Sequence, residues 1–214
     1  MRQYTVTTLL CVALASSVFE ARSSQLPSPR LDPQARGVQT SVLAGGCFWG
    51  VEGVFEALAG VKDVESGYAG DSKILANYSA VSSGTTRHAE SVQITYDASK
   101  ISYGQLLRVF FAVAHDPTQL NRQGPDEGPQ YRSVIFYGSP EQKSVAEAYI
   151  RQLNEAKVFA VGLVTRVVRL EGFYPAESEH QDFMRRNPEN SYVLVHDRPK
   201  LERLRQEFPE LLKR

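Results

Sequence analysis

The protein has 214 residues, of which 42% are hydrophobic and 22% are charged, so it has enough apolar material for one globular domain with a sizeable core. Its 24 lysine and arginine residues balance 24 aspartate and glutamate residues, which excludes a bulk electrostatic attraction to nucleic acid or to an anionic membrane. The two cysteines are too few for a disulfide-stapled scaffold or a cysteine-built zinc site.

The first residues form a segment of their own. Arg2 precedes an apolar stretch over residues 6–19. The small-x-small triplet at 13–15 is typical of signal-peptidase sites, and the triplet at 19–21 is a poorer second choice because it begins with Phe19. The stretch is shorter than the ~20 apolar residues that a membrane-spanning helix needs, so we expect no integral membrane span. We therefore predict that residues 1–21 are a signal peptide and that the protein is exported to a periplasm or secreted. An organelle and the cytoplasm are the alternative locations.

Serine, proline, arginine and glutamine dominate the residues that follow. Little of this segment can be buried, so we predict a disordered linker over 22–40 and a folded domain over 41–214. Cleavage at either triplet would remove Cys11 and leave Cys47 as the only cysteine of the mature protein.

Hydrophobic periodicity predicts alternating strands and helices along the domain. A short apolar run over 41–44 ends at two glycines, and helical spacing of apolar residues follows from Phe48 to Leu58 before Gly60. In chain order, the later patterns predict a strand over 61–68, a strand over 90–96, a helix over 103–114, a long loop over 115–130, a strand over 133–137, a helix over 140–157, a strand over 163–170 and a helix over 199–212. This order indicates an α+β fold, a two-layer α/β sandwich with a mixed sheet.

Cys47 follows Gly45 and Gly46 and opens the first predicted helix. The positive end of the helix dipole and the unpaired N–H groups of the first turn favour a thiolate there, and a thiolate is a nucleophile. Phe48 and Trp49 place two large rings beside the sulfur. A buried structural thiol is the alternative interpretation, because cysteine is commonly buried.

The segment Gly46–Glu52, GCFWGVE, resembles the signature of the A-type peptide methionine sulfoxide reductases. The resemblance continues in the family's order through GYAG at 67–70, SGTTRHAE at 83–90, HDP at 115–117, NRQGPD at 121–126, QYRS at 130–133 and FYPAE at 173–177. These blocks span nearly the whole predicted domain, so they also imply the family's fold, a sheet arranged as a ferredoxin-like plait.

The resemblance implies an activity: reduction of methionine S-sulfoxide, free or in proteins, as a repair after oxidation. Cys47 matches the thiolate that attacks the sulfoxide sulfur. Glu90 matches the general acid that protonates the sulfoxide oxygen, and apolar surroundings would keep such a carboxyl protonated. The products are methionine and a sulfenic acid on Cys47.

Five further residues match family positions. Tyr78 and Tyr131 match the phenols that hydrogen-bond the sulfoxide oxygen, and Phe48 and Trp49 match the walls of the pocket for the substrate methyl group. Asp126 matches a carboxylate that positions water or the hydrogen-bond network. Taken alone, Tyr78 would be a surface residue and Asp126 a turn residue.

The chain departs from the family most clearly after Cys47, because no second cysteine follows it. Many relatives carry a resolving cysteine near the C-terminus, so this chain resembles a single-cysteine variant. We therefore expect an external thiol, such as thioredoxin, glutaredoxin or glutathione, to reduce the sulfenic acid. Smaller departures lie at Arg87, Asp71, Glu179 and Phe183, and the last two replace common tyrosines.

No metal or bound cofactor is expected, since the four histidines form no His-x-x-x-His pair and the resembling family uses none. The expected partners are oxidised proteins or free methionine sulfoxide and a thiol reductant, without nucleic acid, and the expected state is a monomer.

Two alternative functions remain open. One is a non-catalytic binder of oxidised methionine, and the other is a papain-type cysteine hydrolase that uses Cys47, His180 and Asn187 or Asn190.

Overall fold

The computed structural model describes residues 26–214, so the predicted signal peptide at 1–21 lies outside the described residues. The strands are β1 (Val38–Ala44), β2 (Val61–Ala69), β3 (Ala89–Asp97), β4 (Arg122–Gln123), β5 (Asp126–Glu127), β6 (Val134–Tyr137), β7 (Arg166–Arg169) and β8 (Phe173–Pro175). The helices are α1 (Phe48–Glu56), α2 (Tyr78–Ser82), α3 (Tyr103–Val109), α4 (Pro140–Glu155), α5 (Phe183–Arg186) and α6 (Arg198–Glu207). Within this part of the chain, no helix is both long enough and apolar enough to cross a membrane.

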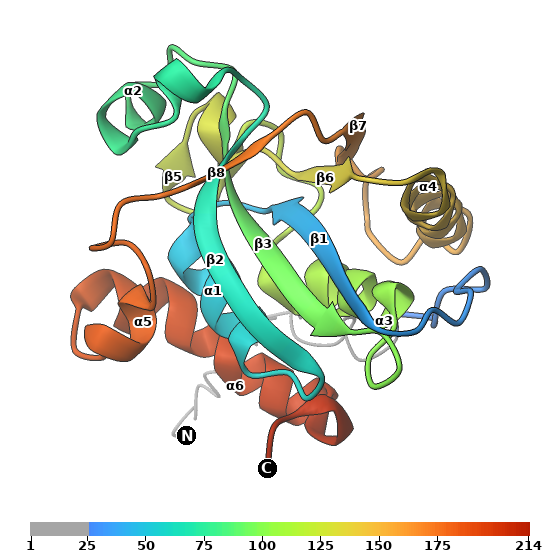
Figure 1. Cartoon of the computed structure of the whole chain (residues 1–214). Coiled ribbons are helices and arrows are strands. Elements are labelled where there is room, and N and C mark those ends of the chain that lie inside the picture. The colour runs from blue at the N-terminus through green and yellow to red at the C-terminus, as the bar shows by residue number, and fades with distance from the viewer. Residues whose placement is uncertain (1–25) are drawn as a thin grey trace, which may run out of the picture.

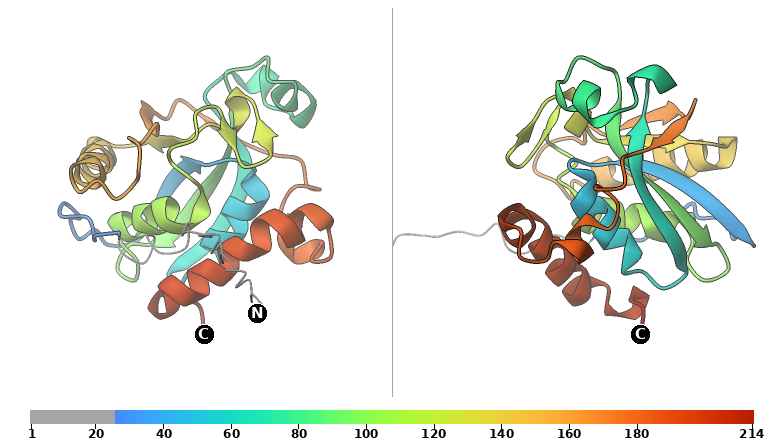
Figure 2. Two further views of the ribbon diagram at one scale, coloured as in Figure 1. Left: turned by 180° about the vertical axis from the view of Figure 1, so that it is seen from behind. Right: turned by 60° about the vertical axis from the view of Figure 1, so that its left-hand side comes forward.

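Six strands form one sheet in the order β7-β6-β1-β3-β2-β8. The pair β6–β7 is parallel, whereas the other neighbouring strands are antiparallel. Helices α1, α3 and α6 cover one face of this sheet, and α4 lies at the edge formed by β6 and β7 (Figures 1 and 2). The prediction of a mixed sheet combined with helices is confirmed.

Five short elements were not predicted: α2, the strands β4 and β5 inside the expected loop over 115–130, β8 and α5. Each is held by contacts that periodicity does not encode. Helix α2 begins where the Asn77 side chain accepts a hydrogen bond from the Ala80 backbone N–H, and β8 exists because it pairs with the end of β2. Segments of two to five residues are too short for a hydrophobic period to be read.

Alternation along the strands directs Glu90 into the core. On β3, Val92 and Ile94 point toward the helices and are fully buried. Glu90 has the same parity as these residues, so its carboxyl enters the apolar layer between the sheet and α1. Tyr68 of β2 lies directly opposite Glu90 in the sheet.

Residues 26–37 differ from the disordered linker that was expected. Leu26 is 2% exposed and belongs to the main core. The Tyr149 hydroxyl donates to the Pro27 carbonyl, and the Gln152 side chain donates to the Ser28 carbonyl. Side chains of α4 thus supply the hydrogen bonds that a segment without regular structure cannot make internally. We call residues 26–37 the N-terminal strap.

Removing the strap's carboxylate should measure how firmly the strap is attached. Asp32 accepts hydrogen bonds from the Ser102 hydroxyl and from the Gly104 backbone N–H, 3.0 Å away, at the beginning of α3. We expect Asp32→Ala to lower the free energy of unfolding in urea by about 1–2 kcal/mol. The exposed Asp63→Ala serves as control and should change it by less than about 0.5 kcal/mol. Equal effects of the two substitutions would mean that the Asp32 hydrogen bonds contribute no stability.

Candidate active site

Cys47 sits at the N-terminal cap of α1, at the end of a turn that requires glycine. Gly46 has a φ of +94°, and a Cβ atom there would lie 2.5 Å from the Gln123 side chain. Only glycine therefore permits this backbone path. Cys47 is 8% exposed, and it is the free cysteine among residues 26–214.

The carboxyl of Glu90 lies at the same turn. Glu90 is 2% exposed, and its Oε2 accepts a hydrogen bond of 3.1 Å from the backbone N–H of Phe48, the residue after Cys47. Burial raises the pKa of Glu90 to about 8, against the opposing effect of the Phe48 N–H and with a further increase from Asp126. The site therefore holds a protonated carboxylic acid at neutral pH.

The thiol itself differs from the thiolate that was expected at a helix N-terminus. Burial raises the pKa of Cys47, and the charges of Glu90 and Asp197 raise it further. Lys200 and the Trp49 backbone N–H lower the pKa, but they do not outweigh burial. In the substrate-free site the thiol is thus the favoured form, because desolvation of an anion opposes the helix dipole.

Two phenols converge on this pair from separate segments. Tyr78 begins α2 and is 39% exposed, whereas Tyr131 comes from the turn over 129–131. Burial raises the pKa of both phenols, and the Glu90 and Cys47 charges add to this increase at each. Both hydroxyls are therefore neutral hydrogen-bond donors at neutral pH.

Asp126 belongs to the same cluster through a residue that the sequence did not indicate. Its Oδ2 accepts a hydrogen bond from the Tyr192 hydroxyl. The Tyr192 ring meets Trp49 edge-on, with ring centroids 5.8 Å apart. Tyr192 thus links the carboxylate to the aromatic wall.

The segment after β8 supplies most of that wall. Phe183 stacks on Trp49 with centroids 3.6 Å apart and planes 8° from parallel. His180 Nδ1 accepts a hydrogen bond of 3.3 Å from Trp49 Nε1, and its ring lies 4.4 Å from that of Tyr78. Phe48 also packs on His180, with centroids 5.4 Å apart. Phe48, Trp49, His180 and Phe183 thus form one aromatic cluster beside Cys47.

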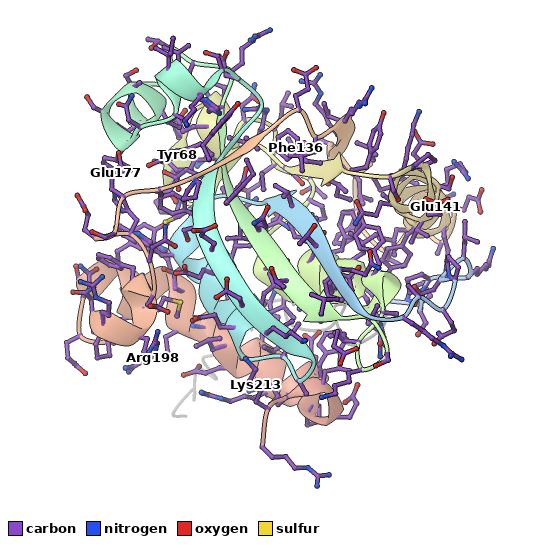
Figure 3. All side chains as sticks on the ribbon, viewed as in Figure 1. Tyr68, Phe136, Glu141, Glu177, Arg198 and Lys213 are labelled. Atoms are coloured by element: carbon purple, nitrogen blue, oxygen red, sulfur yellow. The ribbon has the colours of Figure 1, made fainter. Side chains whose placement is uncertain are left out.

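Glu177 fixes the beginning of α2. Its carboxylate accepts hydrogen bonds from the Tyr68 hydroxyl, 2.9 Å away, and from the Tyr78 backbone N–H, 2.8 Å away. Figure 3 shows Tyr68 and Glu177 approaching each other between β2 and α2. The sequence marked Glu177 only as part of a matching block, because the contact spans about a hundred residues.

Glu52 of α1 is a second buried carboxyl. It is 1% exposed, and burial raises its pKa to about 7. No cluster of three or more histidine, cysteine or acidic side chains that could hold a metal ion lies among residues 26–214.

Comparison with known proteins identifies this arrangement. The family model described as peptide methionine sulfoxide reductase matches residues 39–212, which is most of the chain. The chain belongs to the peptide methionine sulfoxide reductases. A relative from Synechocystis, peptide methionine sulfoxide reductase MsrA 2, is 52% identical over 209 residues and is matched over 98% of its length and 95% of this chain. A relative of the same name from Mesorhizobium japonicum is 53% identical, with 91% of its length and 83% of this chain aligned.

Solved structures agree with these relatives. Reduced Mxr1 from Saccharomyces cerevisiae superimposes with a TM-score of 0.64 at 30% identity, covering 74% of this chain and 90% of that one. Methionine sulfoxide reductase A of Corynebacterium diphtheriae gives a TM-score of 0.61 at 34% identity, covering 71% of this chain and 76% of that one. This peptide methionine sulfoxide reductase therefore reduces methionine sulfoxide and serves in protein repair. The papain-type hydrolase and the non-catalytic binder are both wrong, and His180 bonds to Trp49 as part of the pocket wall.

The stacked partner of Trp49 should tune substrate binding by this reductase. We expect Phe183→Ala to raise KM for methionine sulfoxide about three- to tenfold with little change in kcat, because Trp49 loses the ring that fixes its orientation. Steady-state kinetics check this expectation. The control is Phe183→Tyr, which restores the family's common residue and keeps the stack, so its KM should stay near that of the unmodified protein. An unchanged KM in Phe183→Ala would contradict the role of the stack.

Proposed function

We propose that Cys47 is the nucleophile and Glu90 the general acid of methionine S-sulfoxide reduction. The observation that carries this proposal is the Glu90 carboxyl, which is 2% exposed and accepts a hydrogen bond from the N–H of the residue next to Cys47. The raised pKa of this carboxyl supports its role as an acid. A sulfoxide sulfur becomes electrophilic when its oxygen is protonated, so the acid and the thiol must reach adjacent atoms of one substrate.

In the proposed step, Tyr78 and Tyr131 donate hydrogen bonds to the sulfoxide oxygen while Glu90 transfers its proton to it. The Cys47 sulfur attacks the sulfoxide sulfur, and the Glu90 carboxylate accepts the thiol proton. The oxygen then leaves the methionine sulfur and ends on Cys47 as a sulfenic acid. The methionine sulfur gains two electrons and Cys47 loses two. One proton arrives at the carboxylate as another leaves it, so the buried site gains no net charge, which burial would oppose.

Phe48 and Trp49 form the pocket for the substrate methyl group, supported by His180 and Phe183. Asp126 orients this network through Tyr192. We propose a preference for the S epimer on the family resemblance.

The second half of the cycle needs an external thiol. No cysteine follows Cys47 in the sequence. We therefore propose that a thiol donor, thioredoxin, glutaredoxin or glutathione, attacks the Cys47 sulfenic acid directly. Water leaves, a mixed disulfide forms, and a second thiol of the donor or a second donor molecule releases Cys47.

The test is turnover of racemic methionine sulfoxide by the full chain with dithiothreitol, with the two epimers separated by chromatography. Multiple turnovers that consume one epimer only are expected. Consumption of neither epimer by folded protein with a free Cys47 thiol would overturn the proposal. A parallel series with thioredoxin identifies the donor, and turnover with the small dithiol alone supports direct reduction.

Three further proposals concern the location of the protein, its oligomeric state and the arrangement of its sheet. Export rests on the N-terminal segment alone, and full-length, uncleaved protein in the cytosol would overturn it. A monomer is expected, and light scattering measures it. A ferredoxin-like plait is supported by the order β6-β1-β3-β2, with α1 joining β1 to β2 and α3 lying between β3 and β6.

A further inference from the structure

A partly buried ion pair from the C-terminal helices packs against α1 at Gly50, one turn beyond Cys47. Asp197 has no exposed surface, and its Oδ1 lies 3.0 Å from Lys200 Nζ. A Cβ atom at Gly50 would lie 2.6 Å from Lys200 Nζ and would overlap Asp197 Oδ1. The lack of a side chain at Gly50 therefore lets the pair approach the helix backbone this closely.

The pair faces the turn that carries the thiol. Gly50 follows Cys47 by three residues, and positions three apart on a helix share a face. The C-terminal helices lie beside α1, and Figure 3 labels Arg198 where α6 begins (Figures 2 and 3). The first turn of α6 thus brings the Lys200 ammonium to the side of α1 that carries Cys47.

A purely structural role, in which the Asp197–Lys200 pair joins α6 to α1, does not explain the pair well. Asp197 Oδ2 is buried and has no hydrogen-bond partner among the described residues. Such a group lowers stability, and an apolar pair of similar volume would join α6 to α1 without that cost. The cation is therefore expected to act on something near it.

We propose that Asp197 and Lys200 are positioning residues of the reductase: Asp197 holds the Lys200 ammonium over the first turn of α1, where it stabilises the negative charge of the Cys47 thiolate. This inference rests on the proposed role of Cys47 as nucleophile. Neither residue touches the substrate, and both act through the protonation of the thiol.

Several other groups act on the same thiol or the same carboxylate. The groups that face Cys47 are Glu90 of β3, Tyr78 of α2, Tyr131 of the turn over 129–131, Tyr192 and Asp197 of the C-terminal segment, and Lys200 of α6. Asp197 in turn faces Lys200, Asp126 and His196. Lys200 is the cation that lowers the pKa of Cys47, whereas Asp197 and Glu90 raise it.

Lys200 and Asp197 shift the pKa of Cys47 in opposite directions, and this difference makes the proposal testable. In a Cys11→Ser background, Cys47 is the only thiol, and its alkylation by iodoacetamide can be followed as a function of pH. We expect Lys200→Met to move the alkylation midpoint up by about one pH unit. Asp197→Asn should move the midpoint down, because the amide oxygen still accepts the hydrogen bond from Lys200 Nζ and holds the ammonium in place, whereas the negative charge that opposes the thiolate is gone. At pH 7, Lys200→Met should lower both the alkylation rate and kcat about tenfold with unchanged KM, because thiolate is scarcer.

Two controls separate electrostatic from structural effects. Lys200→Arg keeps the cation and should keep a midpoint near that of the parent, and Lys143→Met on the exposed face of α4 should change nothing. Circular dichroism establishes that each variant is folded. Midpoints that stay constant, or that move in the same direction in Lys200→Met and Asp197→Asn, would overturn the proposal. Alkylation requires no turnover, so the proposed function can fail separately, by retained activity in Cys47→Ser.

Discussion

Replacing Cys47 with serine is expected to abolish reduction of methionine sulfoxide, with a loss of at least about 10⁴-fold in kcat. Serine preserves the shape of the cap at α1, so folding is retained while the nucleophile is lost. Sulfenic acid cannot form on the serine oxygen, and no described residue offers a second thiol. Turnover with dithiothreitol, measured on the full chain, checks this result.

The matched control for this variant is Cys11→Ser. Cys11 lies in the predicted signal peptide, and we expect its loss to leave turnover unchanged. The opposite result, an inactive Cys11→Ser variant and an active Cys47→Ser variant, would show that Cys11 is the nucleophile. A loss in both variants would indicate that the two thiols act together and would refute the single-cysteine mechanism.

Glu90→Gln is expected to lower kcat by roughly 10² to 10⁴-fold with little change in KM, the usual contribution of general acid catalysis. Glutamine can still accept the Phe48 N–H through its carbonyl oxygen but has no acidic proton to transfer. Exposed Glu171→Gln is the control and should retain full activity. A variant at position 90 that retains its rate would show that the proton comes from another group.

The pH dependence follows from the same carboxyl. The pKa of Glu90 is raised to about 8, so the acid form is complete well below pH 8 and disappears above it. The activity of the unmodified protein should therefore fall as pH rises through about 8. This fall in activity should be absent in Glu90→Gln. Because the pKa of Glu90 lies above the ordinary value of 4.5 when the protein is folded, the stability linked to its protonation is complete below about pH 4.5 and is lost as pH rises from there through about 8. Glu90→Gln should thus be at least as stable as the unmodified protein at pH 9 by urea unfolding.

Local patterns located only part of the site. Cys47 follows a glycine turn at the beginning of a helix, a feature that depends on neighbours within a few positions, so the chain reveals it. The strands and longer helices were predictable for the same reason. Glu90, Tyr78, Tyr131 and Asp126 were assigned by the family resemblance; taken alone, Glu90 would be a solvated cap.

The unpredicted residues come from the C-terminal segment. Tyr192 and Asp197 lie in an irregular helical turn, and their partners are about 70 to 150 residues earlier in the chain. No spacing rule connects positions so far apart. The protonation of Cys47 was misjudged for a related reason: the helix dipole is a local property, whereas desolvation depends on every segment that closes over the thiol.

The N-terminal strap also has a consequence for the order of folding. Its contacts with Tyr149 and Gln152 join residues 122 and 124 positions apart, so the strap leaves the ribosome long before its docking helix exists. At ordinary rates of synthesis this interval lasts roughly 6 to 25 s. Long-range contacts of this kind close only after the sequence between them has been ordered. The first residues of the domain to be made are thus among the last to find their native neighbours.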